Sequence, residues 1–520
     1  MGRQATACLE LGRHASGPSH PHTSHMIVCG VDVHGGCKRG TVELGYPKLN
    51  GAVFMSRFVQ SISSALSAAV VAACLAVLPA LAQDVRGDRP EPVSRAIDLV
   101  SDNPRAVTDA IDYFIKRKNP DGAFALVQAM RFHRNLRPAL GVAASSITGV
   151  DHGDSWFKWM EWLQKQDDLV PFDGFDESRA LLLAQIDPNF YGFIYPGVAH
   201  DIALWEAVWG GVLKDGIPAL INPELVPQSE ADYLSDEELV FGVEINGDVR
   251  AYPLRIMDWH EMFNDVIGGV PVSLAYCTLC GSGILFETAV EGHDTPLTFG
   301  SSGLLYRSNK LMYDHATQSL WNQFTGRPVV GELTGSGIEL KTRPVTITTW
   351  GGWRRSNPGT RVLSLNTGYD RNYTPGAPYA DYFNSPDLIF PAPVDEAALE
   401  PKDYVFALRG SGAEKAWRLS AFEGGAVLND MAGVVPVTLI GNAATRTVRA
   451  YRTDGRVFSK TEDPSVLVSD GGKWTVSESG ISGPDGTVFH RMPGHIAFWF
   501  AWDGYLGDEG ELAALAELSN

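Results

Sequence analysis

Two cysteines, Cys277 and Cys280, stand in the string YCTLCGSG and are the residues of this sequence best suited to chemistry. Thiols at this spacing can bind one metal ion, cycle between dithiol and disulfide, or form a permanent disulfide. Thiolates select soft ions, so copper(I) is the cofactor we expect if the pair binds a metal. In the chain-entropy model, a permanent disulfide that closes so small a ring adds only about 2 kcal/mol to the free energy of unfolding. Stabilisation alone therefore explains the cysteine pair poorly.

Several other chemistries lack their motifs. A structural zinc site needs four protein ligands, and no second cysteine pair follows the first. Gly281 stands where covalent c-type haem requires a histidine. The glycine-rich string FGSSG, residues 299–303, lacks the lysine and helix of a phosphate-binding loop, so we expect a tight turn there. Patterns such as GxSxG, HExxH and the dinucleotide fingerprint do not occur, which leaves hydrolase and nicotinamide chemistry without support.

The chain has the pattern of a secretory signal peptide over residues 55–82. A basic Arg57 precedes an apolar stretch at residues 65–78, and the small-residue pattern Ala-Leu-Ala follows at 80–82. The apolar run is short for a membrane anchor. We therefore expect cleavage after residue 82 and a periplasmic or secreted protein with no membrane span.

Two features qualify this prediction. Cys74 follows Val-Ala-Ala, as at a bacterial lipoprotein site, so a lipid anchor is a less favoured alternative. Residues 1–54 show no sustained periodicity, and we interpret them as a mis-assigned upstream start. Cys277 and Cys280 are then the cysteines that the mature chain keeps.

Composition places the mature chain among ordinary globular proteins. Hydrophobic residues make up 44% of the sequence, and the formal net charge is −19. Nucleic acid needs a basic footprint, so this charge argues against it as a partner. Apolar residues at three- and four-residue steps predict a helical region over residues 91–209.

From about residue 210 the period changes and predicts a mainly β reactive domain over residues 210–396, so the fold class is α+β. Asn246-Gly247 separates two alternating stretches and predicts a hairpin. Residues 255–265 suit one short helix, and strands are expected on both sides of the cysteine turn, at 270–276 and 284–289.

The same order of residues returns at a constant offset of 165, which predicts an internal duplication with a degenerate second copy and C-terminal tail over residues 397–520. Gly268 matches Gly433, and the string PVSL at residue 271 matches PVTL at residue 436. The copies differ where chemistry is expected. The second copy has Gly425, Ala426, Asn442 and Thr445 in place of His260, Glu261, Cys277 and Cys280.

This joint loss selects the other candidate site residues. We expect His260 to be a further metal ligand beside the cysteines, and Glu261 to support the site; the alternative is that both only form hydrogen bonds. Asp314 is a candidate acid–base group. Asn264 and Asp265 survive in the second copy, so we interpret them as hydrogen-bonding residues at a helix end. Further supporting positions are Ser302, Trp321 and Gln323.

The string YCTLCGSG, with WHEMFNDVIGG before it and SLWNQFTGRPVVGELTG after it, resembles a bacterial and archaeal family, domain of unknown function 3179. The likeness covers about residues 210–373. Thr278 stands where the family commonly has proline, which should loosen the turn without removing a ligand. The resemblance implies the domain and its motif positions, and no activity, substrate or cofactor.

Three functions therefore stay open. The first is an exported protein whose Cys277–Cys280 site binds a thiophilic metal, copper by preference, and supports oxidation–reduction as an oxidoreductase. The second is a metal-free thiol–disulfide oxidoreductase, and the third is a non-catalytic module with a structural disulfide. The expected partner is a small molecule or another exported protein.

Overall fold

The computed structural model describes residues 30–31, 37–38, 89–410 and 414–514. The chain divides into two compact units, Met1–Leu81 and Ala82–Asn520. In the first unit the short strands β1 (Gly30–Val31) and β2 (Cys37–Lys38) pair antiparallel. The predicted signal peptide and Cys74 lie outside the described residues.

The predicted helical region is confirmed. Its central helix is α4, in which every residue from Ala123 to Met130 is buried. Asn103 begins α3 by accepting hydrogen bonds from two backbone N–H groups of the first turn. No helix of the described residues is both long enough and apolar enough to span a bilayer. The bounds are α2 Glu91–Asp98, α3 Pro104–Arg117, α4 Ala123–Phe132, α5 Arg137–Thr148, α6 Trp156–Gln164 and α7 Phe175–Ile186.

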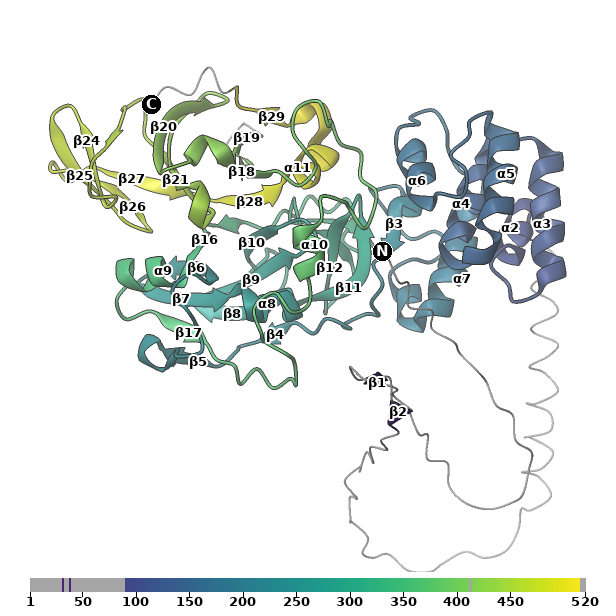
Figure 1. The fold of residues 1–520 in the computed structure, drawn as a ribbon, viewed down its shortest axis with the longest axis horizontal. Helices are drawn as coiled ribbons and strands as arrows, with labels where there is room; N and C mark the ends of the chain where they lie inside the picture. The colour runs from purple at the N-terminus through teal and green to yellow at the C-terminus, as the bar shows by residue number, and fades with distance from the viewer. Residues whose placement is uncertain (1–29, 32–36, 39–88, 411–413, 515–520) are drawn as a thin grey trace, which may run out of the picture. The chain divides into compact units, whose positions relative to one another are not determined.

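We call residues 210–396 the first lobe and residues 397–514 the second lobe (Figure 1). The first lobe builds sheets with the strand orders β15-β10-β9-β8-β4, β14-β13-β12-β11-β3 and β16-β6-β7-β17-β5. The strands of the second sheet are β3 Ala207–Trp209, β11 Phe299–Tyr306, β12 Asn309–Asp314, β13 Leu320–Asn322 and β14 Arg327–Val330. Those of the other two are β4 Leu220–Ile221, β5 Leu225–Pro227, β6 Leu239–Ile245, β7 Asp248–Pro253, β8 Met262–Ile267, β9 Val270–Cys277, β10 Ser282–Glu287, β15 Thr342–Arg343, β16 Thr346–Thr349 and β17 Arg361–Leu363. The helices are α8 Leu254–His260, α9 Trp350–Ser356 and α10 Ala380–Asn384.

The second lobe contains a sheet with the order β28-β18-β19-β29 and a longer sheet with the order β20-β21-β22-β27-β26-β25-β24-β23. The two end strands of the longer sheet, β20 and β23, also contact each other, so this sheet curls on itself. The bounds are β18 Tyr404–Leu408, β19 Lys415–Arg418, β20 Ala426–Ala432, β21 Val435–Asn442, β22 Thr447–Arg452, β23 Ser459–Lys460, β24 Val466–Ser469, β25 Gly472–Val476, β26 Gly480–Ser482, β27 Val488–Met492, β28 Gly494–Phe498, α11 Trp499–Leu506 and β29 Glu511–Leu512.

The two lobes repeat one backbone order. At the offset of 165, β9 and β10 coincide residue for residue with β21 and β22, and the short helix α8 coincides with a 3-10 turn at Leu419–Phe422. Side-chain bonds repeat too. Asn264 exchanges hydrogen bonds with the backbone N–H and C=O of Phe299, and Asn429 does so with Phe458. The predicted duplication is therefore visible in the hydrogen bonds as well as in the sequence.

Two local predictions were wrong. Helix α8 ends at His260, and Asn264 and Asp265 lie on strand β8 and not at a helix end. The reason is Glu261, whose left-handed φ of 56° turns the chain out of the helix and into the strand. Residues 299–303 form no tight turn but the first half of β11, where a shift of register between Ser301 and Leu305 interrupts the pairing with β12.

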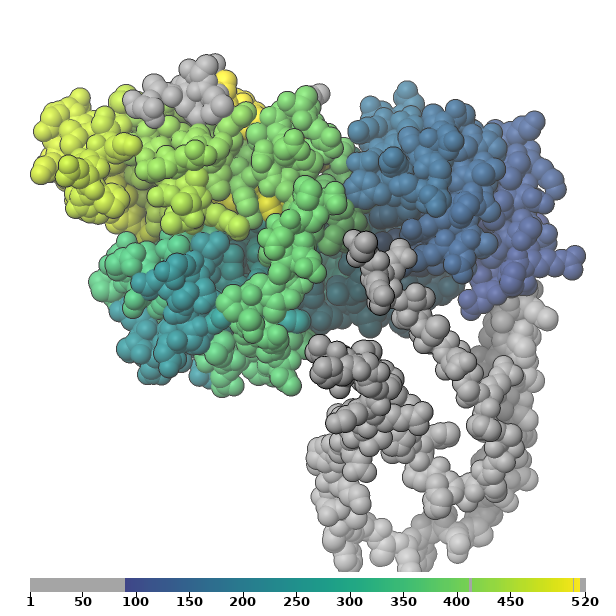
Figure 2. Space-filling model, in the orientation of Figure 1, coloured from purple at the N-terminus to yellow at the C-terminus, as the bar shows by residue number. Residues whose placement is uncertain are grey.

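The lobes pack on a shared apolar core, which contains Phe241 and Tyr276 of the first lobe together with Phe406 and Trp417 of the second. A connecting segment runs from the first lobe to the second. Figure 2 shows it in green, across the face on which the teal first lobe and the yellow second lobe meet. This segment, residues 364–400, supplies side chains to the site described next.

Candidate functional site

The β9–β10 hairpin carries both cysteines. Cys277 is the last residue of β9 and pairs with Ser282, the first residue of β10. The turn between them closes with a hydrogen bond from the Cys280 N–H to the Cys277 carbonyl, at 3.2 Å. Gly281 has a left-handed φ of 60°, which a glycine adopts at no steric cost. The turn brings the two sulfurs together, and they form a disulfide.

A cavity of about 270 Å³ adjoins this turn, and Cys277 lines it. Cys280 is fully buried, and its Sγ lies 3.4 Å from the carbonyl oxygen of Ser308. The wall is mainly apolar and includes Leu279, Leu304 and Phe390. Cys277 is also buried, at 3% exposure, so the two cysteines differ in that Cys277 lines the cavity and Cys280 is not among its described lining residues.

A buried ion pair forms the polar part of the cavity. Lys310 Nζ donates to Glu261 Oε2 at 2.6 Å, and both residues line the cavity. The side chains are 4% and 10% exposed. Lys310 also approaches Ser301 Oγ at 3.3 Å, and Thr278 donates to Glu261 Oε1 at 3.0 Å. The Thr278 hydroxyl, in the cysteine turn itself, thus links the turn to the ion pair.

The position of Glu261 follows from the backbone. Its carbonyl accepts the N–H of Tyr276 at 2.7 Å, which places the residue beside the end of β9. Lys310 comes from the neighbouring sheet, where β12 pairs with β11. Three separate stretches of sequence therefore meet at the cysteine turn.

The connecting segment closes the site from outside. Tyr379 donates to Glu261 Oε1 at 3.0 Å, and Tyr382 donates to the carbonyl of Leu279 at 2.7 Å. Burial, and next the charge of Glu261, raise the pKa of Tyr379, so its hydroxyl keeps its proton. In Figure 1 this segment with α10 passes in front of β12 and α8.

His260 is held away from a ligand role. Its Nδ1 lies 2.8 Å from the Pro218 carbonyl and its Nε2 lies 2.6 Å from the Tyr373 hydroxyl. Burial lowers the pKa of His260, so the ring is neutral, donates from Nδ1 and accepts at Nε2. Neither nitrogen is left for a metal ion. Across the described ranges, no group of three or more His, Cys, Asp and Glu side chains is arranged to hold one.

Asp314 is also occupied. Its carboxylate accepts from the Thr317 N–H at 2.6 Å, from the Thr317 hydroxyl at 2.7 Å and from Trp321 Nε1 at 2.9 Å. It is fully buried, and among the described residues the lining of the cavity does not include it. Trp321 belongs to the same buried apolar cluster as Cys277 and Cys280, but neither it nor Asp314 is among the described residues that line the cavity. The bonds of Asp314 hold together the loop between β12 and β13.

Gln323 and Ser302 are the remaining predicted supporting residues, and of these two described residues only Gln323 contacts the cysteine hairpin. Gln323 donates to the carbonyls of Ala275 and Ser282, at 3.0 and 3.3 Å, and so braces both strands of the cysteine hairpin. Ser302 bonds with the backbone of Leu304 and Leu311 and stabilises the irregular part of β11.

Sequence reasoning missed Lys310, Tyr379 and Asp258. The one sequence signal for Lys310 is that it directly precedes the apolar residues Leu311, Met312 and Tyr313. Asp258 lies on α8 and accepts from the hydroxyl of Tyr276, the residue before Cys277, at 3.2 Å. Burial raises the pKa of Asp258 to about 7, and the negative charge of Glu261 adds to the shift.

The family model described as protein of unknown function (DUF3179) matches residues 214–509. This match spans more than half of the chain, so the protein belongs to that family. It includes the second lobe, whereas the sequence resemblance was noted only to about residue 373. The comparison with curated proteins and the comparison with solved structures gave no match.

Proposed function

We propose that this protein is an exported thiol–disulfide oxidoreductase whose redox pair is Cys277 and Cys280. The observation that carries the proposal is the unequal position of the two cysteines relative to the cavity. Both are buried, at 3% and 0% exposure, but Cys277 lines the cavity, and Cys280 is not among the described residues that line it. A pair that reacts by exchange needs one sulfur that a substrate can reach and one that closes the ring again.

The reaction is an exchange between this disulfide and a dithiol substrate. A substrate thiolate attacks Cys277 Sγ, the Cys277–Cys280 bond breaks, and Cys280 leaves as a thiolate. The second substrate thiol then attacks the substrate sulfur of the mixed disulfide and releases Cys277. Two electrons pass to the protein, the substrate leaves as a disulfide, and the two thiol protons pass to the released cysteines or to water. The reverse reaction with a disulfide restores the oxidised pair.

The ion pair gives the cavity its chemistry. We propose that the Lys310 ammonium, which lines the same largely apolar cavity as Cys277, favours the thiolate of the reduced pair. Glu261 holds this ammonium in place through the bond of 2.6 Å. A cavity of about 270 Å³ admits a small dithiol or one protruding side chain, so we propose a small dithiol or disulfide as the substrate.

Copper binding stays a prediction. Two thiolates at this spacing suit copper(I) when the pair is reduced. It has less support than exchange, because both nitrogens of His260 are used in hydrogen bonds. Export also stays a proposal, and it rests on the signal pattern of residues 55–82.

Single-cysteine variants test the proposal. The Cys280→Ser variant keeps Cys277 at the cavity and should react with a small aromatic disulfide at least about tenfold faster than the Cys277→Ser variant, which keeps the buried sulfur. Both variants are compared after unfolding in urea, where their rates should become equal.

The wild-type pair supplies the second readout. In the folded protein, dithiothreitol should reduce it reversibly, and thiol titration should find two new thiols. A pair that dithiothreitol reduces only after unfolding would leave the disulfide a structural one. One equivalent of copper that survives a chelator, and disappears in Cys277→Ser, would instead favour the metal site.

A further inference from the structure

A second, larger cavity lies in the second lobe. It has a volume of about 640 Å³, within the range of pockets that hold small-molecule ligands. Residues of the curled sheet line it, and residues of α9 from the first lobe contribute to its wall.

Its position is that of the duplicated site. Gly425, Ala426, Asn442 and Thr445 replace the four residues His260, Glu261, Cys277 and Cys280, and all four replacements line this cavity. The second copy therefore lost the reactive side chains and kept a cavity at the same place in the repeat. Glycine and alanine stand here in place of His260 and Glu261, and this cavity is the larger of the two.

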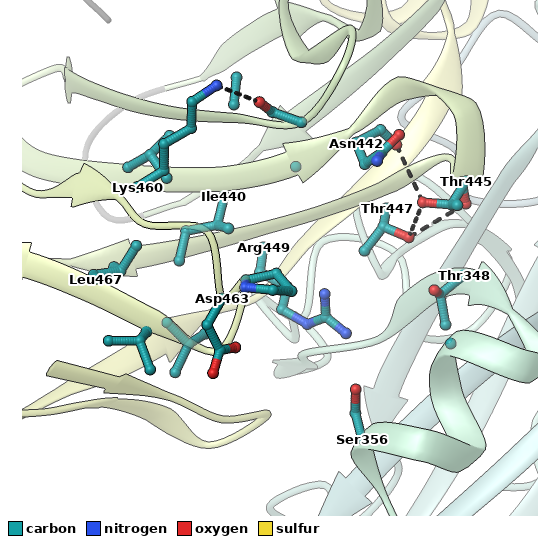
Figure 3. A pocket seen from close by; sticks show the side chains of 18 of the residues that line it. Thr348, Ser356, Ile440, Asn442, Thr445, Thr447, Arg449, Lys460, Asp463 and Leu467 are labelled. Atoms are coloured by element: carbon teal, nitrogen blue, oxygen red, sulfur yellow. Dashed lines mark hydrogen bonds between the residues drawn. The ribbon is translucent and has the colours of Figure 1, made fainter.

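One part of the wall is apolar. Val427, Ile440, Leu467 and Val476 belong to the core of the curled sheet and also line the cavity. Figure 3 shows Ile440 and Leu467 on one side of the pocket and Thr348 and Ser356 on the other. A ligand that fills the cavity thus meets apolar surface at one end.

The opposite part of the wall carries hydrogen-bond donors. Arg449 and Arg491 share one carboxylate, that of Glu478, and the charge of Glu244 also acts on Arg491. Arg449 binds Glu478 through Nε and Nη2, and among the described residues neither its Nη1 nor the hydroxyl of Thr348 has a hydrogen-bond partner. In Figure 3 the Arg449 guanidinium extends toward the side of Thr348 and Ser356.

Exposed charges around the opening are mixed. Arg355 lines the cavity next to Ser356 and is 69% exposed. Two acidic residues, Glu462 and Asp463, line another part of the wall. The Asp463 carboxylate accepts the N–H and the hydroxyl of Ser465, so its own turn uses it.

We propose that this cavity binds a small organic anion, with its carboxylate against Arg449, Thr348 and Arg355 and its apolar body against Ile440 and Leu467. A charge-assisted bond to a guanidinium fixes the carboxylate, and burial of the apolar body adds affinity. The proposal does not depend on thiol chemistry, because the cysteine positions are Asn442 and Thr445 here.

The probe is 4-phenylbutyrate, compared with its uncharged amide, 4-phenylbutanamide, by isothermal titration. The carboxylate should bind saturably. The amide should bind at least about tenfold more weakly, because it lacks the charge-assisted bond. Arg355→Gln should raise the Kd of the carboxylate about two- to fivefold, the range for an exposed charge pair.

The matched control is Arg354→Gln. Arg354 lies on the same helix and pairs with the same carboxylate, Asp236, but among the described residues the cavity lining contains only Arg355 of the two. Its Kd should stay that of the wild type. A second variant, Ala426→Glu, puts back the acidic residue of the first copy and should abolish binding of the carboxylate. Equal affinity for acid and amide, no saturable binding, or affinity unchanged in both Arg355→Gln and Ala426→Glu would overturn the proposal.

Discussion

The backbone N–H of Phe498 donates to the carbonyl of Cys280 at 2.8 Å, so a strand of the second lobe holds the cysteine turn of the first. Gly281, the next residue of the turn, faces the same strand. A Cβ at Gly281 would lie 3.0 Å from a ring carbon of Tyr404 and 3.3 Å from two of Phe498. The second lobe thus directly supports the lobe that carries the cysteines.

Gly281→Ala tests this support. The left-handed φ of 60° should cost about 1 kcal/mol with any Cβ, and the contact with two aromatic rings should bring the loss to about 2–3 kcal/mol. Gly153→Ala is the control, because Gly153 has a similar φ of 57° and open space at its Cβ. Urea unfolding measures both. Equal losses would mean that the second lobe leaves room at the turn.

The buried ion pair predicts a strong dependence of stability on both partners. Lys310→Met leaves the Glu261 carboxylate buried without its cation and should cost about 3 kcal/mol or more. The double variant Glu261→Gln/Lys310→Met removes both charges and should recover most of this loss, so the double-mutant cycle should give a large coupling energy.

The exposed pair Arg327–Glu339 is the control for this cycle. Its side chains are 59% and 40% exposed, and Arg327→Met should cost less than about 1 kcal/mol. If Lys310→Met costs as little as Arg327→Met, then water reaches Glu261 freely and the cavity is not the secluded site described above.

Because the pKa of Asp258 is raised, we expect the protein to lose stability as the pH rises. In the unfolded chain this carboxyl loses its proton near pH 4, whereas the folded protein retains it up to a pKa of about 7. The folded state therefore binds more protons between these values, and its contribution to the free energy of unfolding falls across this window, by roughly 4 kcal/mol at most.

Asp258→Asn should remove this dependence and raise stability at pH 8 relative to the wild type, while the amide oxygen still accepts from Tyr276. Urea unfolding at pH 5 and pH 8 checks it, as the difference between variant and wild type at each pH. A variant that is no more stable than the wild type at pH 8 would contradict the raised pKa.

Much of the framework followed from local patterns. Asn246-Gly247 turns at φ values of 52° and 82°, as a hairpin requires. The strand before the cysteine turn begins at Val270, and the strand after it ends at Glu287. These features depend on neighbours in sequence. The constant offset of 165 could be predicted equally well, because the stretch that ends with β10 in the first copy and β22 in the second has the same length in both.

The residues of the site could be predicted less well from the sequence, because contacts between distant parts of the chain bring them together. Lys310 lies 49 residues from Glu261 and Tyr379 lies 118 residues away, and nothing local to either indicates the pairing. His260 was selected because it disappears with the cysteines. In the structure His260 bonds to Tyr373, in a segment that the second copy does not repeat, so its loss there does not require a metal.

The repeated asparagines give the last prediction. Asn264 binds both backbone groups of Phe299, at 2.8 Å to the N–H and 2.9 Å to the carbonyl, and Asn429 binds both groups of Phe458 at 2.9 Å. Either Asn→Ala variant leaves a backbone donor and a backbone acceptor without partners, which should cost about 1–3 kcal/mol. Asn264 is buried and Asn429 is half-buried, so Asn264→Ala should cost more.

The control is Asn366→Ala, which removes one exposed bond to Glu224. It should cost less than about 0.5 kcal/mol in the same urea titration. Should Asn429→Ala match this control while Asn264→Ala does not, the second copy would have kept the geometry of this bond without its energetic role, because water would then replace the amide there.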